Sequence, residues 1–152
     1  MVTDIFDWIT IALYNRFGEN YKYYVEEVEQ NANTPCFMVN ALEPLIRARS
    51  PVKYYRVFPI VIHYFTDKDS TSEARKDCYS VAENLWDCLE YLDGTADEKP
   101  VKIRGNNMSW EIVEGVLQFH ITYDFFVNRN VEHIYMEDGT YNGIRMRVDD
   151  YI

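Results

Sequence analysis

Two histidines, His63 and His120, lie in the middle of apolar segments that predict β-strands. Imidazole is a common zinc ligand and a base near neutral pH, so histidines on adjacent strands would supply half of a metal site. A zinc site needs a third protein ligand, and no residue stands at an obvious spacing to provide one. We therefore interpret both as hydrogen-bonded strand residues, with a metal site as the alternative.

Two groups of acidic residues are the next candidates for chemistry. Asp67, Asp69 and Glu73 are close together just before an apolar stripe, a position typical of the entry to a helix. Glu111 and Glu114 flank a predicted hairpin turn, and paired carboxylates can perform acid-base catalysis. No nucleophile or partner base stands near that pair in the sequence, so we interpret the pair as a surface strand end. We interpret the first group as helix capping, with a metal site as the alternative.

Known catalytic motifs are missing from the sequence. It contains no glycine-rich phosphate loop, HExxH, GxSxG or EF-hand pattern. We therefore predict no catalytic residue, no metal ligand and no cofactor, and a protein that is not an enzyme.

The cysteines are Cys36, Cys78 and Cys88, an odd number without a CxxC pair. They predict neither a disulfide framework nor a zinc site, and Cys36 and Cys78 fit small core positions in a reducing cytosol. No apolar run approaches the roughly 20 residues of a membrane span. We expect a soluble chain with no membrane partner.

The net charge is −10, which disfavours sequence-specific binding to nucleic acid because the phosphate backbone is also negative. The charge is segregated. Residues 44–56 carry four basic side chains and no acid, whereas residues 67–98 carry ten acids and three bases. This segregation suggests identical subunits that meet head to tail; the alternative is a solvated helix face beside an ordinary loop.

Two segments have the apolar spacing of amphipathic helices. The first covers residues 3–17 and the second covers residues 70–92. Ser70 and Glu73 have the spacing of a capping box, and Gly94 is the predicted C-terminal stop.

The remaining segments predict strands and turns. Pro59 cannot donate to a ladder, so its strand is expected to be an edge or to carry a bulge there. Residues 44–51 are predicted to be a loop and residues 105–107 a turn, and Glu114-Gly115 is predicted to be a tight hairpin. The predicted strands cover residues 21–28, 36–42, 53–65, 99–104, 109–113 and 116–127.

These elements predict an α+β fold, a mostly antiparallel sheet with two main helices packed on one side. We predict one domain over residues 1–128. Residues 129–152 are predicted to be a C-terminal extension, a hairpin or arm packed on the body or on a neighbour. The predicted core contains Trp8, Leu13, Val81, Leu85, Leu89, Phe119 and Ile121.

Four stretches, in order, carry a family resemblance. They are YKYYVEEVEQ at residues 21–30, PCFMV at 35–39, IHYF at 62–65 and EIVEGVLQFHITYDFF at 111–126. With the N-terminal amphipathic helix they cover roughly residues 3–128. In this order they resemble the tail-terminator-like proteins of phages and prophages of Gram-positive bacteria. None of the four is a catalytic signature.

The resemblance implies a subunit of a six-membered ring that caps the head-proximal end of the phage tail tube. The implied partners are further copies of the chain, the tail tube protein and the head-tail connector protein. The implied location is the virion tail, after assembly in the host cytoplasm. The alternatives are a head-tail connector or head-completion protein and, from another class, a small prophage-encoded enzyme or inhibitor.

The segregated charges supply candidates for the contact between subunits of such a ring. We predict that the basic segment of one subunit meets an acidic helix face of its neighbour, with tyrosines supplying apolar contact. The alternative is that the segment is a solvated loop. The candidate interface residues are Arg47, Arg49, Lys53, Tyr54 and Tyr55 on one side and Asp77, Glu83, Asp87 and Glu90 on the other.

Overall fold

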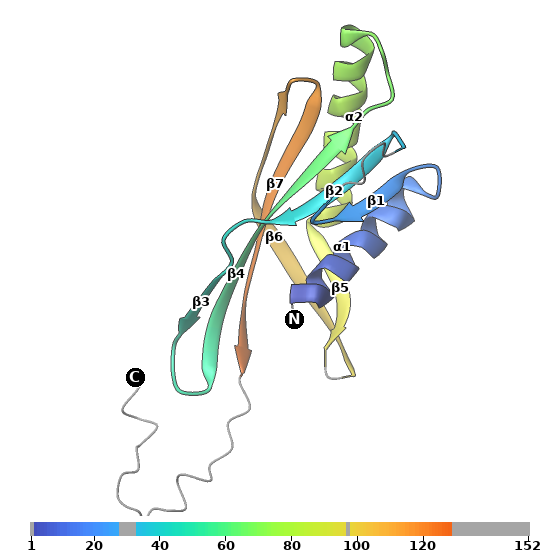
Figure 1. Ribbon diagram of the computed structural model, residues 1–152. Coiled ribbons are helices and arrows are strands. Elements are labelled where there is room, and N and C mark those ends of the chain that lie inside the picture. Colours follow the sequence, from blue (N-terminus) through green and yellow to red (C-terminus); the bar gives the residue numbers. More distant parts are fainter. Residues whose placement is uncertain (1, 28–32, 97, 129–152) are drawn as a thin grey trace, which may run out of the picture. The chain divides into compact units, whose positions relative to one another are not determined.

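The computed structural model describes residues 2–27, 33–96 and 98–128 (Figure 1). Within these ranges the chain forms two helices and seven strands. The helices are α1 (Val2–Phe17) and α2 (Thr71–Leu89). The strands are β1 (Lys22–Val25), β2 (Cys36–Ala41), β3 (Leu45–Ala48), β4 (Lys53–Phe65), β5 (Tyr91–Ala96), β6 (Lys99–Val113) and β7 (Val116–Asn128).

The chain divides into two compact units. The first is formed by Met1–Glu43 with Phe58–Tyr123, and the second by Pro44–Val57 with Asp124–Ile152. The predicted C-terminal extension, residues 129–152, lies outside the described residues. The domain boundaries predicted from the sequence therefore stay a prediction.

The strands form one sheet in the order β1-β2-β4-β7-β6-β5, and β3 also pairs with β4. The registers of β2 and β3 with β4, of β5 with β6 and of β6 with β7 are antiparallel, whereas β1 and β2 are parallel. This arrangement confirms the α+β class with a mostly antiparallel sheet.

Both helices bury one apolar stripe and contact each other. In α1 the buried side chains include Ile5, Ile9 and Leu13, which recur at the spacing of one helix face. In α2 the buried residues are Cys78, Val81, Ala82, Leu85 and Leu89. Trp8, which was predicted to be in the core, is only half-buried because its ring lies at the margin of this stripe against β5. The other six predicted core residues are buried.

The predicted ends of the second helix were partly wrong. Ser70 is the N-cap residue, but its side chain makes no capping hydrogen bond, so the capping box does not form. The helix ends at Leu89, and Leu92 and Gly94 belong to β5. Gly94 is required by close packing: an added Cβ would lie 2.0 Å from the Trp8 ring.

The segment predicted as a loop at 44–51 contains strand β3, which pairs with β4 from Leu45↔Val57 to Ala48↔Tyr54. Pro59 is therefore not on an edge strand, since β4 has neighbours on both sides. Its position is between two ladders, because the β2 pairing begins at Ala41↔Ile60. The Pro59 carbonyl accepts a 2.8 Å bond from the Leu42 N–H, and the ladder needs no donor from the proline.

Residues 105–107, predicted as a turn, lie inside the single long strand β6. The register with β7 shifts between Asn106 and Ser109, and Asn107 has a positive φ of 53°, which together mark a bulge. The hairpin at Glu114-Gly115 is confirmed, since Val113 pairs with Val116 and both turn residues have positive φ.

Alternation along β7 positions the core of the first unit. Leu117, Phe119, Ile121 and Tyr123 are buried, whereas the residues between them are half-buried. The described buried residues include no polar or charged residue. Hydrophobic burial under α1 and α2 is therefore the main stabilising contribution in this unit.

Candidate subunit interface

The basic arm, defined as residues 44–57, contains β3, a turn and the first part of β4. Its turn is closed by hydrogen bonds from the N–H groups of Arg49 and Ser50 to the Lys53 carbonyl, at 2.8 and 3.1 Å. The Ser50 hydroxyl oxygen accepts a further bond of 3.0 Å from the Lys53 N–H. All four residues of β3 are exposed. The arm therefore contains an exposed strand, β3, and is not an irregular loop.

The period-2 alternation of the arm sorts its side chains onto two faces. Arg47 lies directly opposite Tyr55, and Leu45 lies opposite Val57, so these four share one face. Tyr54 lies opposite Ala48 on the other face. Of the interface candidates, Arg47 and Tyr55 are thus brought together and Tyr54 is separated from them.

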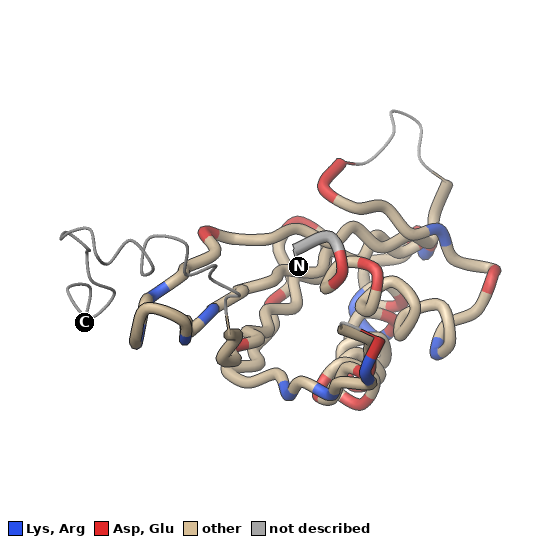
Figure 2. Tube along the Cα trace, turned by 90° about the horizontal axis from the view of Figure 1, so that it is seen from below, with Lys and Arg blue, Asp and Glu red and all other residues tan. Residues whose placement is uncertain are grey.

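The second unit holds Tyr55 in place through the end of β7. The Tyr55 hydroxyl donates a short hydrogen bond to the Asp124 carboxylate, which raises the pKa of Tyr55. The centres of the Phe126 and Tyr55 rings are 5.1 Å apart. Arg49 and Lys53 lie over the Tyr55 and Phe126 rings, at 5.4 and 4.9 Å from the ring centres. These contacts form a cation-aromatic cluster in the second unit. Figure 2 colours Lys and Arg positions along the trace blue and Asp and Glu positions red.

The four acidic candidates do not form one patch. Asp77 is half-buried and accepts hydrogen bonds from the hydroxyls of Tyr64 and Thr66, at 2.6 and 2.7 Å. It therefore acts inside the first unit. Glu83, Asp87 and Glu90 recur at the i, i+4 and i+7 positions of one helix face.

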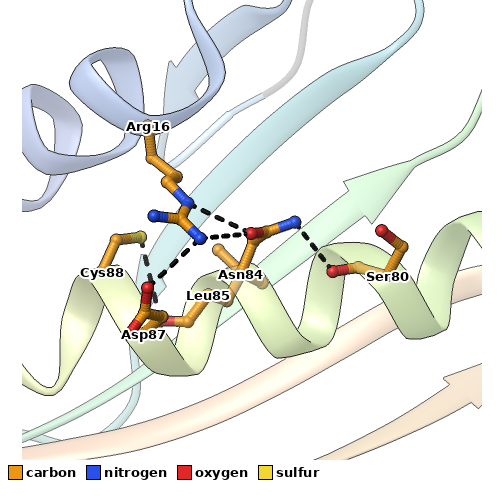
Figure 3. A network of polar contacts seen from close by, with 6 residues as sticks. All are labelled: Arg16, Ser80, Asn84, Leu85, Asp87 and Cys88. Carbon is orange, nitrogen blue, oxygen red and sulfur yellow. Dashed lines mark hydrogen bonds and ion pairs between the residues drawn. The ribbon is translucent and has the colours of Figure 1, made fainter.

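Two acids of that face already have basic partners. Arg16 of α1 lies 3.2 Å from the Asp87 carboxylate and donates bonds of 2.6 and 3.1 Å to the Asn84 side chain (Figure 3). Arg104 of β6 lies 3.1 Å from the Glu90 carboxylate. Within residues 2–27, 33–96 and 98–128, Glu83 has no ion pair. Glu83 is therefore the acid of this face that is open to a partner.

A cavity beside Glu83 was missed by the sequence analysis. The Trp cavity, of about 290 Å³, is lined by Ala82, Glu83, Trp86, Met108, Trp110 and Phe119. Trp110 lies opposite the buried Phe119 in the β6–β7 ladder. The centres of the Trp110 and Tyr79 rings are 5.3 Å apart. A sequence signal existed: Tyr79, Glu83 and Trp86 recur at i, i+4 and i+7 off the apolar stripe of α2. Aromatic residues on the polar face of a helix are typical of contact surfaces.

The two strand histidines interact electrostatically, since His120 affects the titration of His63. Burial and then the charge of His120 lower the pKa of His63. In the described part of the chain, no cluster of three His, Cys, Asp or Glu residues stands ready for a metal ion. His63 Nδ1 is buried without a hydrogen-bond partner among those residues, so the hydrogen-bonded interpretation of His63 is wrong at that atom.

The environment of each of the three thiols raises its pKa and so disfavours the reactive thiolate. Burial raises the pKa of Cys36 and Cys78, both of which are core residues as predicted. Burial also raises the pKa of Cys88 to about 11. A catalytic thiol needs a lowered pKa, so these cysteines act as apolar side chains.

A family model described as phage tail terminator protein matches residues 4–135. No curated protein sequence matches the chain. One solved structure aligns with 83% of this chain and 96% of its own length, at 10% sequence identity and a TM-score of 0.38. None of the described helices has both the length and the apolar character of a membrane span.

Proposed function

We infer the function of this chain from its family, because the chain belongs to the phage tail terminator proteins. It is a structural protein of the phage tail. We propose that it forms a ring, a hexamer, on the head-proximal end of the tail tube. The ring ends tube polymerisation and presents the surface to which the head connector joins. The observation that carries this proposal is the family match over residues 4–135.

The surface of the described chain supports an assembly role. Tyr79, Trp86 and Trp110 are each two-fifths exposed or more, although aromatic rings of this size are usually buried. Exposed aromatic groups are enriched at protein-protein contacts, where they bury a large area at low entropic cost. The second unit adds exposed apolar side chains on β3, which among the described residues pairs with β4 alone.

The acidic balance of the chain supports a place around the DNA path. DNA passes through a tail, and a wall of net negative charge repels its phosphates and so prevents sticking. The chain carries −10 overall although the basic arm contributes four positive charges. We therefore propose that the arms are used in protein contacts and not in contacts with DNA.

Catalysis is not part of the proposed function. The family is structural, and the described residues contain no cluster of three His, Cys, Asp or Glu residues that could hold a metal ion. Purified protein is expected to show no nuclease, protease or phosphatase turnover with or without divalent metals. A metal-dependent activity that disappears in His63→Ala would contradict this expectation.

Deletion of the gene in the phage tests the tail role directly. Because the tube would lack its stop, electron microscopy should show normal heads beside unjoined tails of abnormal and variable length. Expression of the chain from a plasmid should restore normal length. Tails of normal length beside defective heads would support a head-completion protein instead.

A further inference from the structure

The Trp cavity is an exposed site built on α2, β6 and β7 of the first unit. Trp86 of α2 is 52% exposed and Trp110 of β6 is 40% exposed, and Met108 and the buried Phe119 also line the cavity. Tryptophan and methionine in a concave site are typical of the residues that dominate binding between proteins. Such a site needs an apolar anchor from its partner.

The negative charge of Glu83 at the cavity favours a partner that carries a cation beside its apolar group. Glu83 lines the cavity, and no ion pair neutralises it within the described ranges. Elsewhere on α2, the Arg75 guanidinium donates to the Tyr79 hydroxyl at 3.1 Å and lies over the Tyr79 ring. A partner that fits places its apolar group between the tryptophans and a cation at Glu83.

The basic arm of another copy has this chemistry. Leu45 and Arg47 are two residues apart on the same face of β3, so their side chains project side by side roughly 7 Å apart. Leu45 is 40% exposed, and the whole of β3 is open. In a chain of net charge −10, the arm is the segment with four bases and no acid.

We propose that the Trp cavity of one subunit receives β3 of the next, with Leu45 between Trp86 and Trp110 and Arg47 at Glu83. The contact is heterologous, because it joins two different surfaces of identical chains, and repetition of such a contact generates a ring when the rotation closes. This inference rests on the proposed ring function. It replaces the acidic helix face predicted from the sequence with a cavity in which only Glu83 of that face takes part.

Single substitutions on each side test the two surfaces. Trp86→Glu and Leu45→Glu should each raise the concentration at which rings form by about tenfold or more, measured by mass photometry. Two matched controls introduce the same charge elsewhere. Ile46→Glu lies on the opposite face of β3, and Ile11→Glu lies on α1, both at residues more than half exposed. Both controls should assemble as the wild type does.

Mixing the two defective variants gives the decisive measurement. Each keeps one intact surface, so the mixture should form 1:1 dimers and no larger ring, whereas each variant alone should stay monomeric. Arg47→Glu and Glu83→Arg should likewise be defective alone and recover assembly when combined in one chain. Circular dichroism of every variant confirms that the fold is intact.

The outcomes separate this inference from the proposed function. If Trp86→Glu and Leu45→Glu form rings as readily as the wild type, the proposed contact is wrong and the ring function still stands. Loss of tube binding with rings intact would assign the cavity to the tube protein and also overturn the contact. A wild-type chain that stays monomeric even on tail tubes would overturn both the ring function and the contact.

Discussion

The Tyr123 hydroxyl donates a 2.6 Å hydrogen bond to the carbonyl oxygen of Leu89, the last residue of α2. Carbonyls in the last turn of a helix have no partner inside the helix, so a buried helix end needs donors from elsewhere. The next carbonyl, that of Glu90, accepts from the Gly105 N–H at 2.6 Å. The end of α2 is therefore held by β7 and by the start of the β5–β6 ladder.

Replacement of Tyr123 by Phe keeps the ring and removes the donor. Because Tyr123 is fully buried, the Leu89 carbonyl would be left unsatisfied, and the free energy of unfolding should fall by about 1–3 kcal/mol. Urea denaturation measures the change. Tyr91→Phe is the matched control, since Tyr91 is half exposed, and it should leave the midpoint in place. Equal midpoints for both variants and the wild type would show that the bond contributes nothing.

Replacement of Leu85 by Ala should lower the free energy of unfolding by about 2–5 kcal/mol. Leu85 is fully buried in the centre of the α2 stripe, and truncation leaves a cavity that close-packed neighbours fill only in part. Thermal unfolding followed by circular dichroism measures the loss. Ile11→Ala, at an exposed position of α1, should change stability by less than about 0.5 kcal/mol. A similar small effect of both substitutions would contradict the assigned core.

Stability should fall at alkaline pH through the half-buried Tyr23. Burial raises the pKa of Tyr23 from 10.0 to about 12, while its hydroxyl donates to the Gly18 carbonyl at 2.6 Å. A raised pKa in the folded state means that this stabilisation is complete below pH 10 and is lost as pH rises from 10 to about 12. Unfolding free energies measured from pH 8 to 12 should therefore decline above pH 10. Tyr23→Phe should be less stable at pH 8 and show a shallower decline, and an equal slope would exclude Tyr23 as a cause.

Assembly should depend on the charge of the basic arm. The double variant Arg47→Glu with Arg49→Glu should assemble less readily than the wild type at low salt, because exposed charges act over a longer range there. Light scattering across salt concentrations measures this. The double variant Lys99→Glu with Lys102→Glu on β6 makes the same change in net charge at exposed positions and should have a smaller effect. Equal assembly of the arm variant and the wild type at low salt would exclude the arm as a contact.

The sequence by itself determined the elements whose pattern is local. Alternation at Leu117, Phe119, Ile121 and Tyr123 defined β7 and its buried face, since successive side chains of a strand point to opposite sides. The apolar stripe of α2 and the Glu114-Gly115 turn could also be predicted from the sequence, because helix periodicity and tolerance of positive φ depend only on neighbouring residues. The family resemblance also followed from the order of these local stretches.

Only the tertiary structure decided which segments meet. Gly94 was interpreted as a helix stop, yet it is needed because Trp8, far away in the sequence, packs on it. Four exposed residues became strand β3 because the backbone of β4 supplies partners, a choice that local propensity does not encode. Asp77, Asp87 and Glu90 have partners on other elements, while Trp86 and Trp110 line one cavity with Glu83. The physical reason is that periodicity specifies a face, whereas the partner of that face depends on packing between residues distant in the chain.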